Sequence, residues 1–484
     1  MTAVVMLAVF FVATLVVGLM PTILQRRAGT TMSSGEYFLG GRGLGLVLIF
    51  FTLMATWYSS GVFLGSVAEV YTKGLEWVFG FTSSAIAAIV FLLLGPKIKR
   101  LGDRHGYVTQ ADMYADRFKS PAVGYLSGLI GIVFIIPYIT IQMVGTGYII
   151  ETFTDGIIPY WAGALIGLLV CFAFIYTGGI RSVAWTDVFF GILFLLSIWG
   201  VVLIVADNAF GGFGSMFSTI VDENTELLTL PGPEGVTWTY FFSQAWVIGL
   251  GGYMWPHLFM RMFASDSVKS IRRSGSLLIL ASLVAQIPIV IGALAAANAF
   301  PGLDSPDTAL LVLVKEYAPL WIVGILAVGG VAASLSTINS LIHSEGVLIS
   351  NDIYAKIKRK NANDRSVLRF TRLVITVLCV LVYLMSLTEP QFLWSIMAQA
   401  YGGVIQFFPV TIAALYWKKA TKEGVFAGMS VGVAVTLFFS LGPVAEPLGI
   451  VAPAWGLLAN VICLIAVSLA TQSRRPALEK ETVA

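Results

Sequence analysis

Charged residues are scarce in this chain of 484 residues. Asp, Glu, Lys and Arg together make up 11% of it, whereas hydrophobic residues make up 57%. An ordinary soluble domain carries roughly 25% charged residues, so this composition excludes a water-soluble globular protein. Apolar stretches of about 18 or more residues recur along the chain, and each is long enough to cross a bilayer as a helix. A membrane β-barrel would instead show alternating segments of about ten residues, and the chain lacks that pattern.

Residue types used in catalysis and metal binding are also scarce. The three histidines, His105, His257 and His343, lie in different segments, and none has the spacing of metal ligands. The three cysteines lie in separate apolar stretches and are predicted to be small buried residues. A P-loop and a nucleophile elbow are both missing, and the net charge of +3 is spread along the chain. We therefore expect neither an enzyme nor a nucleic-acid-binding protein, and no cofactor.

What the chain does contain is a succession of apolar segments that its hydropathy divides into thirteen predicted membrane helices. Their ranges are 3–22, 45–71, 76–96, 121–152, 157–176, 184–206, 237–263, 274–299, 317–343, 367–387, 391–417, 424–441 and 450–471. The first segment has no basic start, so it is expected to remain as a helix and not to be cleaved as a signal peptide. Residues 1–484 are expected to form a single all-α transmembrane domain.

The positions of basic residues indicate the orientation of these helices, because cytoplasmic loops carry an excess of Lys and Arg. If there are thirteen helices, every basic loop falls on one side of the membrane and the acidic loops fall on the other. The basic loops include Arg26, Lys99, Arg117, Lys269, Lys356, Lys360 and Arg475. We therefore expect a multi-pass protein of the cell membrane with its N-terminus outside and its C-terminus in the cytoplasm.

The thirteen helices contain two consecutive blocks of five, residues 45–206 and residues 237–417. Because five is an odd number, the two blocks must have opposite orientations in the bilayer, as in the inverted repeats of many secondary transporters. The first helix and the last two helices, in 424–471, would then be peripheral. This leucine-transporter-like fold is inferred from the helix count, since the two blocks show no obvious sequence identity.

Polar residues interrupt the ninth predicted helix in the stretch VAASLSTINS, residues 331–340. The hydroxyls of Ser336 and Thr337 face the same helical turn as the carbonyl of Ala333, which precedes them by three or four residues. Three oxygens can therefore converge on one point and could contribute to a site for a small cation such as Na⁺. The alternative interpretation is that these hydroxyls bond to their own helix or lie at close helix contacts.

A second interruption lies in the second predicted helix, in LMATWYSSGVFLG, residues 53–65. A helix break there would free backbone carbonyls around Ala55 and Tyr58. Such backbone is tolerated at membrane depth only where it lines a site. The two interruptions together therefore predict a site that backbone and hydroxyl oxygens form between the second and ninth helices.

Five stretches resemble the sodium:solute symporter family, over about residues 36–430. They are EYFLGGRGLG (36–45), GGIRSVAWTD (178–187), GYMWPHLFMRMFASDSVKSIRRS (252–274), AASLST (332–337) and YWKKATKEGVFAGM (416–429). The resemblance implies sodium-coupled symport of a small solute. It also implies a sodium site made of the carbonyls of Ala55, Tyr58 and Ala333 and the hydroxyls of Ser336 and Thr337.

Some members of this family bind a second sodium ion through an acid in the sixth helix and hydroxyls further along the ninth. Asp187 matches the acid and Ser340 matches one hydroxyl, whereas Asn339 stands where a serine is expected. The resemblance therefore implies either a second sodium site or a path for ion exit at these residues. The alternative for Asp187 is a structural role, in which its side chain contacts a helix N-terminus or a loop near the cytoplasmic end of the sixth helix.

The solute is expected between the broken second and seventh helices, beside the fourth and eleventh. The candidate residues are Ser59, Ser60, Tyr138, Gln142, Trp246, Tyr253, Trp255, Tyr401 and Gln406. Glycines and Pro256 in AWVIGLGGYMWPHL predict a hinge in the seventh helix. Glu69 and His343 are further functional candidates, the first as an intramembrane carboxylate, whereas Arg181 and Arg261 are expected at the cytoplasmic interface.

The segments 106–144 and 256–267 look most like members of the family that carry small monocarboxylates. The predicted pocket contains no evident buried Arg or Lys for a sugar acid or a dicarboxylate. We therefore predict a small carboxylate-bearing solute, with proline or pantothenate as the alternatives. A function of another class, a membrane sensor that acts with a separate signalling protein, stays open. The expected partners are Na⁺, the solute and the lipid bilayer; a monomer is the working expectation and the oligomeric state is open.

Overall fold

The computed structural model describes residues 1–29, 31–233, 236–356, 363–390, 393–442 and 446–472, so the basic residues Lys360 and Arg475 lie outside the described part. Within these ranges the protein is helical and contains no strand. The α-helices are α1 (Thr2–Arg27), α2 (Ser34–Leu39), α3 (Leu46–Trp57), α4 (Ser60–Phe63), α5 (Gly65–Lys73), α6 (Val78–His105), α7 (Gln110–Arg117), α8 (Pro121–Phe153), α9 (Tyr160–Phe210), α10 (Phe213–Glu223), α11 (Trp238–Gly251), α12 (Pro256–Ala264), α13 (Val268–Ala299), α14 (Ala309–Tyr317), α15 (Leu320–Leu348), α17 (Asp364–Ser386), α18 (Leu393–Val404), α19 (Phe407–Tyr416), α20 (Lys422–Leu441) and α21 (Ala452–Thr471). Two further segments matter below, the 3₁₀ turn η4 (Gly252–Met254) and the π-helical η6 (Ile349–Ala355).

Ten of the described helices are long and apolar enough to cross a membrane, so the chain is a multi-pass membrane protein. The predicted count of thirteen is not reproduced by this measure, because several predicted helices are merged or broken. The predicted helix 184–206 and all but the first three residues of 157–176 lie within α9, and 237–263 is divided between α11 and α12. Residues Ser60–His105 likewise count as one candidate span.

Gly179 marks the point where α9 changes direction. Its φ of 58° and ψ of −147° are not helical, and a positive φ is readily adopted only by glycine. A Cβ at this position would also lie 2.4 Å from the carbonyl oxygen of Tyr37. The kink therefore needs glycine both for its backbone conformation and for the close approach of the segment before α3.

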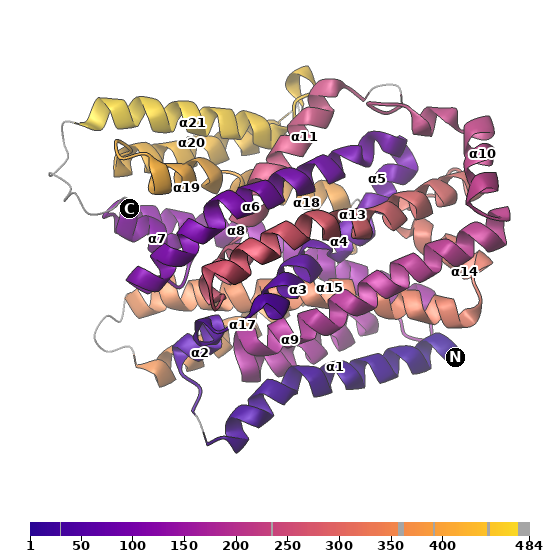
Figure 1. The fold of residues 1–484 in the computed structure, drawn as a ribbon, viewed down its shortest axis with the longest axis horizontal. Helices are drawn as coiled ribbons and strands as arrows, with labels where there is room; N and C mark the ends of the chain where they lie inside the picture. Colours follow the sequence, from indigo (N-terminus) through magenta and orange to yellow (C-terminus); the bar gives the residue numbers. More distant parts are fainter. Residues whose placement is uncertain (30, 234–235, 357–362, 391–392, 443–445, 473–484) are drawn as a thin grey trace.

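The helices run roughly parallel to one another and surround α15 (Figure 1). Of the most apolar window of Leu320–Ala355, 83% is buried, whereas the corresponding figures are 28% for α1 and 22% for α21. Figure 1 shows α1 along α9 at one side of the bundle and α20 packed on α21 at the other. The polar stretch of α15 therefore lies in the interior, and α8 and α9 pack against it.

Candidate functional site

The second predicted helix is broken between α3 and α4. Tyr58 follows α3 with φ −89° and ψ 70°, and Ser59 is extended. The Ser59 hydroxyl accepts a hydrogen bond from the backbone N–H of Val62 at 3.3 Å, as a serine at a helix N-cap does. The helical hydrogen bonds are thus interrupted at the predicted place, and the last carbonyls of α3 are free for other partners.

A second break separates α11 from α12. Pro256 is the first residue of α12, and the preceding Trp255 has the extended ψ of 128° that a following proline favours. Gly252 in η4 lies so close to Trp57 that a Cβ would come within 2.3 Å of the indole. The two breaks therefore contact each other at the centre of the bundle.

The hydroxyls of α15 reach the carbonyls that the first break frees. Ser336 Oγ is 2.8 Å from the carbonyl oxygens of both Ala55 and Ala333. Thr337 Oγ1 donates to the carbonyl of Thr56 at 3.2 Å and lies 3.3 Å from that of Ala333. Hydroxyl and carbonyl oxygens of two helices, distant in the sequence, thus converge in a fully buried place.

The predicted sodium-site residues differ in how closely they approach this point. Ala55, Ala333, Ser336 and Thr337 are brought together, and the Thr56 carbonyl joins them, which the sequence did not single out. Tyr58 lies at the break itself, and its ring stacks on Phe194 with centroids 6.0 Å apart. The ion itself and its full set of ligands stay a prediction.

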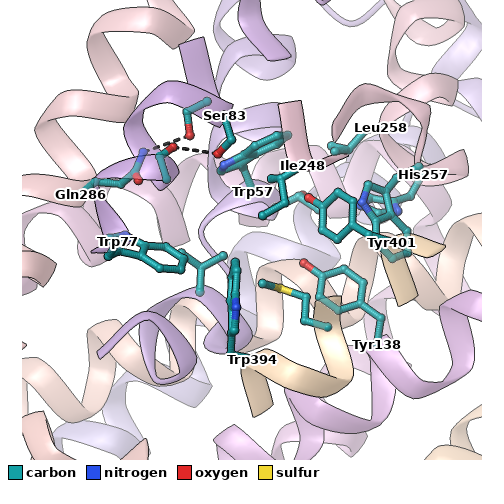
Figure 2. Close-up of a pocket in the computed structure, with 16 residues that line it drawn as sticks. Trp57, Trp77, Ser83, Tyr138, Ile248, His257, Leu258, Gln286, Trp394 and Tyr401 are labelled. Carbon is teal, nitrogen blue, oxygen red and sulfur yellow. Dashed lines mark hydrogen bonds between the residues drawn. The ribbon is translucent and has the colours of Figure 1, made fainter. Parts of the chain in front are cut away.

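Beside this point lies a small cavity whose walls are mainly aromatic (Figure 2). Its lining residues are Thr56, Trp57, Val62, Trp77, Gly80, Ser83, Ser84, Tyr138, Ile248, Trp255, His257, Leu258, Gln286, Trp394, Met397 and Tyr401. The free volume is about 30 Å³, which holds one or two water molecules. The aromatic side chains must therefore move apart to admit an organic solute.

The cavity contains buried nitrogen atoms that lack a partner among the described residues. They are the indole Nε1 of Trp77, the indole Nε1 of Trp394 and the Nδ1 of His257. Trp77 and Trp394 pack edge to face with ring centroids 4.5 Å apart, and Figure 2 shows them on the opposite side of the space from His257 and Tyr401. Buried N–H groups are normally hydrogen-bonded, so the two indoles, whose Nε1 atoms always carry a hydrogen, mark places for an acceptor.

Three of the nine predicted solute-binding residues line this cavity. The Trp255 ring packs between those of Tyr138 and Tyr401, at centroid distances of 4.8 and 5.2 Å. Behind the lining, the Tyr138 hydroxyl contacts Ser59, Ser60 bonds Gln142, and Tyr253 packs on Trp57. The remaining lining residues, such as Trp77, Ser84, Gln286 and Trp394, were not predicted.

Two predicted solute-binding residues face elsewhere, which corrects the prediction for them. Trp246 is 53% exposed on the outer face of α11. Gln406 is buried, but its amide oxygen accepts a hydrogen bond from Asn460 of α21 at 3.0 Å. Hydropathy does not reveal which face of a helix turns inwards when the whole segment is apolar.

The remaining single candidates have identifiable contacts. Glu69 pairs with Lys73 at 2.9 Å on the border of a second, more open cavity. The Nε2 of His343 lies 2.9 Å from the carbonyl of Tyr37, which ties α15 to α2. Arg181 is about half exposed and pairs with Glu36 at 3.0 Å.

Two of the three residues predicted for a second ion site are linked to a buried arginine, Arg261, either directly or through Thr52. Asp187 accepts a hydrogen bond from the Thr52 hydroxyl, and Ser340 accepts one from Arg261 at 2.6 Å. Asn339 is buried, and its amide has no partner among the described residues. Arg261, expected at the cytoplasmic interface, has a side chain that is 0% exposed within the protein.

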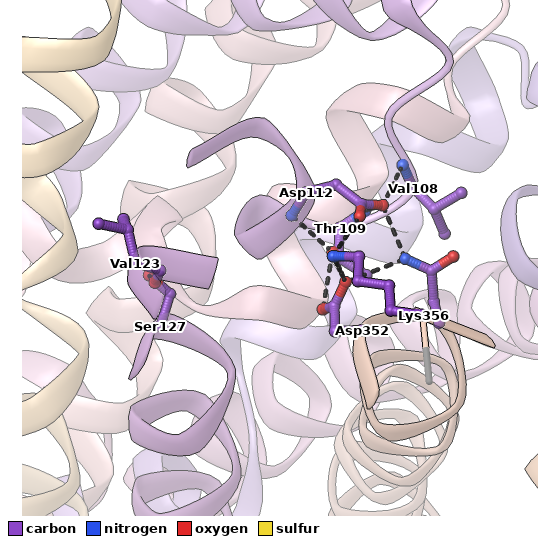
Figure 3. A network of polar contacts seen from close by, with 8 residues as sticks. Val108, Thr109, Asp112, Val123, Ser127, Asp352 and Lys356 are labelled. Atoms are coloured by element: carbon purple, nitrogen blue, oxygen red, sulfur yellow. Dashed lines mark hydrogen bonds and ion pairs between the residues drawn. The ribbon is translucent and has the colours of Figure 1, made fainter. Parts of the chain in front are cut away.

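A charged cluster lies where α7 meets η6 (Figure 3). Lys356 Nζ is 2.8 Å from Asp112 and 3.1 Å from Asp352, and the Thr109 hydroxyl is 2.8 Å from the Asp352 carboxylate. Burial on its own would lower the pKa of Lys356, but Asp352 and Asp112 raise it above its ordinary value. The cluster therefore fastens the end of the central helix to α7 through ion pairs.

Comparisons with known proteins point to one family. A model described as the sodium:solute symporter family matches residues 37–432. Sequence relatives include the sodium/pantothenate symporter of Escherichia coli (strain K12), which is 28% identical over 84% of each chain. The high-affinity proline transporter PutP of Bacillus subtilis (strain 168) is 26% identical over 92% of this chain and 94% of its own length.

Another relative is YhjB of Bacillus subtilis (strain 168), described as an uncharacterized symporter, which is 27% identical over 94% of this chain and 95% of its own. Among solved structures, a Na⁺-coupled sialic acid symporter in a substrate-bound outward-open state has a TM-score of 0.81 to this chain. Its identity is 20%, and the match covers 97% of this chain and 98% of that one. The two proteins therefore share a fold.

Proposed function

The chain belongs to the sodium:solute symporter family, and from that premise we propose that it imports a small carboxylate-bearing solute, such as a monocarboxylate, together with Na⁺. The transport would follow alternating access. The observation that carries the proposal is the meeting of freed carbonyls and hydroxyls beside an aromatic cavity with unpaired N–H groups. Proline or pantothenate transport is the alternative, since relatives with those printed names cover most of the chain.

The proposed sodium ligands are the carbonyls of Ala55, Tyr58 and Ala333 and the hydroxyls of Ser336 and Thr337. A hydroxyl has one proton to donate and lone pairs to accept with. The oxygens that now donate to the Ala55 and Thr56 carbonyls could therefore turn their lone pairs to an ion. The set is neutral, so the positive charge of Na⁺ stays available to a nearby anion.

Thr56 offers a physical link between ion and solute. Its carbonyl accepts from Thr337, and the same residue lines the aromatic cavity. A change in the backbone at the break would therefore alter both the ion site and the aromatic cavity. This supports a coupled mechanism in which the ion completes the solute site.

The proposed topology has thirteen membrane helices, in which residues 45–206 and 237–417 form inverted repeats. The breaks between α3 and α4 and between α11 and α12 support it, because each lies in the first helix of its block. Broken helices at corresponding positions of two repeats are typical of binding sites in secondary transporters. The N-terminus would be outside and the C-terminus cytoplasmic.

The preference for a carboxylate rests on the chemistry of the cavity. None of its sixteen described lining residues is Asp, Glu, Lys or Arg. The unpaired indole N–H groups of Trp77 and Trp394 could donate to carboxylate oxygens, and a bound Na⁺ nearby would balance the charge. A solute with a strong cationic group would find no acidic partner among these residues.

Uptake into proteoliposomes tests the function. We expect an inward Na⁺ gradient, and not an equal K⁺ gradient, to drive uptake of a labelled monocarboxylate in preference to proline and pantothenate. Replacing Trp394 by Phe removes one N–H, and we expect KM to rise about tenfold, because losing a hydrogen bond to a charged group costs about 1.5 kcal/mol.

Trp246→Phe is the matched control, because that indole lies on the outer face of α11, and its KM is expected to stay unchanged. Uptake that ignores Na⁺ would refute symport. If Na⁺ drove the uptake of proline or pantothenate but not that of the monocarboxylate, that solute would replace the monocarboxylate in the proposed function. Equal KM values in both tryptophan variants would remove Trp394 from the solute site.

A further inference from the structure

Arg261 is fully buried within the protein and is held by three contacts. Its Nη2 donates to Ser340 Oγ at 2.6 Å, its Nε donates to Thr52 Oγ1 at 3.2 Å, and its Nη1 donates to the carbonyl of His257 at 3.1 Å. These partners come from α15, α3 and its own helix, α12. The guanidinium is thus fixed at the junction of three segments.

Asp187 faces the same junction from α9. The Thr52 hydroxyl donates to one of its carboxylate oxygens and accepts from Arg261, so a single hydroxyl bridges the two groups. The other carboxylate oxygen has no partner among the described residues. Since an uncompensated buried charge is very unfavourable, Asp187 and Arg261 account for each other's presence in the interior.

The guanidinium therefore stands where the sequence predicts a second sodium ion. Of the three residues predicted for that ion, Ser340 is bonded to Arg261 directly and Asp187 is bonded to it through Thr52. A sodium ion between these oxygens would face a fixed positive charge at short range, and repulsion between like charges is strong in a protein interior.

We propose that Arg261 is a tethered cation that fills the second ion position between Asp187 and Ser340, so that one Na⁺ accompanies each solute. This inference rests on the proposed function. The same side chain is linked to the first ion site through two residues, because Ser340 Oγ is 2.9 Å from Thr56 Oγ1 and the Thr56 carbonyl accepts from Thr337. Arg261 is therefore a positioning residue for the coupling ion as well as a substitute for a second one.

The proposal has an electrical consequence. One Na⁺ and one monovalent anion carry no net charge across the membrane, so uptake of a monocarboxylate would be electroneutral and indifferent to voltage. A transporter that used two sodium ions would instead carry one net positive charge inwards in each cycle, and an inside-negative potential would drive its uptake.

The wild-type protein in proteoliposomes provides the first test. Radioactive sodium and labelled monocarboxylate are counted in the same vesicles, and we expect about one Na⁺ per solute and no response to an imposed membrane potential. A ratio of about two, with uptake driven by an inside-negative potential, would overturn the inference while leaving sodium symport intact. Uptake without any Na⁺ dependence would instead refute the proposed function on which the inference rests.

Variants provide the second test. In Arg261→Gln, Asp187 loses its cation, and we expect the Hill coefficient for Na⁺ to rise from about 1 towards 2, because it is limited by the number of sites. Arg261→Lys keeps a cation and Arg261→Gln with Asp187→Asn removes the acid, so both are expected to stay near 1. A folded Arg261→Gln protein whose coefficient stays near 1 would contradict the proposal, and if that variant does not fold, the wild-type ratio still decides.

Discussion

Arg261 and Lys356 both join helices that are distant in the sequence, but they do so in different surroundings. Arg261 is 0% exposed and reaches Asp187 only through the Thr52 hydroxyl. The Lys356 side chain is 35% exposed and pairs directly with two carboxylates. The buried cation is fixed by a rigid fork of donors, whereas the lysine is a flexible point charge that water can also solvate.

The difference indicates separate tasks. A cation that water cannot reach is costly to move, which suits a permanent part of an ion site. The Lys356 ammonium is partly solvated although Asp352 is buried, so these ion pairs cost less to break and to form again than the contacts of Arg261 do, which suits a contact that opens in each transport cycle. The cluster of Lys356 links α7 to the end of α15 (Figure 3), so its opening would release the central helix at that end.

The largest effect is expected when one partner of the buried pair is removed. Asp187→Asn leaves Arg261 uncompensated, and breaking a buried pair costs about 3–5 kcal/mol. We expect thermal unfolding in detergent to reveal a marked loss of stability, with partial recovery when Arg261→Gln is added. Asp155→Asn is the control, because both partners of its pair with Lys315 are about half exposed or more. Equal stability of the two single variants would break the comparison.

A smaller effect is expected for Lys356→Met. The Lys356 side chain is 35% exposed but that of Asp352 is only 2% exposed. The loss should therefore exceed the contribution of a surface pair, about 1 kcal/mol or less, and stay below that of a fully buried pair, and its solvated part should fall as salt rises. We expect a modest loss of stability that shrinks between low and high ionic strength. A loss as large as that of Asp187→Asn, or one indifferent to salt, would show that the two clusters are equivalent.

The smallest effect is expected for Asp116 on α7. Burial on its own would raise the pKa of Asp116, but the Tyr107 hydroxyl, Lys119 and His105 lower it below its ordinary value of 3.8. A carboxylate with a lowered folded pKa contributes stability that is present above 3.8 and lost as the pH falls through its folded value. We expect wild type and Asp116→Asn to differ slightly at neutral pH and to converge below about pH 4. A difference in stability between the two proteins that persists below about pH 4 would argue against the ionised Asp116 carboxylate as its source.

The sequence predicts best what interrupts a pattern. Ser336 and Thr337 are hydroxyls in an apolar helix, and the stretch around Ala55 breaks a second one, so both stand out before any contact is known. Their convergence follows because backbone polar groups at membrane depth need partners. The helical class follows from composition for the same reason.

The sequence predicts poorly what depends on partners from other helices. The burial of Arg261 depends on Thr52 and Ser340, which lie 209 and 79 residues away in the sequence. The residues next to Arg261 in the sequence do not predict these contacts. Trp246 and Trp255 are alike in sequence, yet only the second lines the cavity. Polar residues in apolar segments, such as Ser84 and Gln286, were a usable signal, because they bond each other at 2.9 Å.

The central claim is that the hydroxyls of α15 and the freed carbonyls of α3 together bind the coupling ion. Equilibrium binding of radioactive sodium to the purified protein tests it most directly, with Ser336→Ala and Thr337→Ala beside the control Ser334→Ala, whose hydroxyl bonds its own helix at Gly330. The account predicts that Ser336→Ala and Thr337→Ala each weaken binding by about tenfold or more, about 1.4 kcal/mol, while Ser334→Ala binds as the wild type does. Undiminished sodium binding in both Ser336→Ala and Thr337→Ala would contradict it.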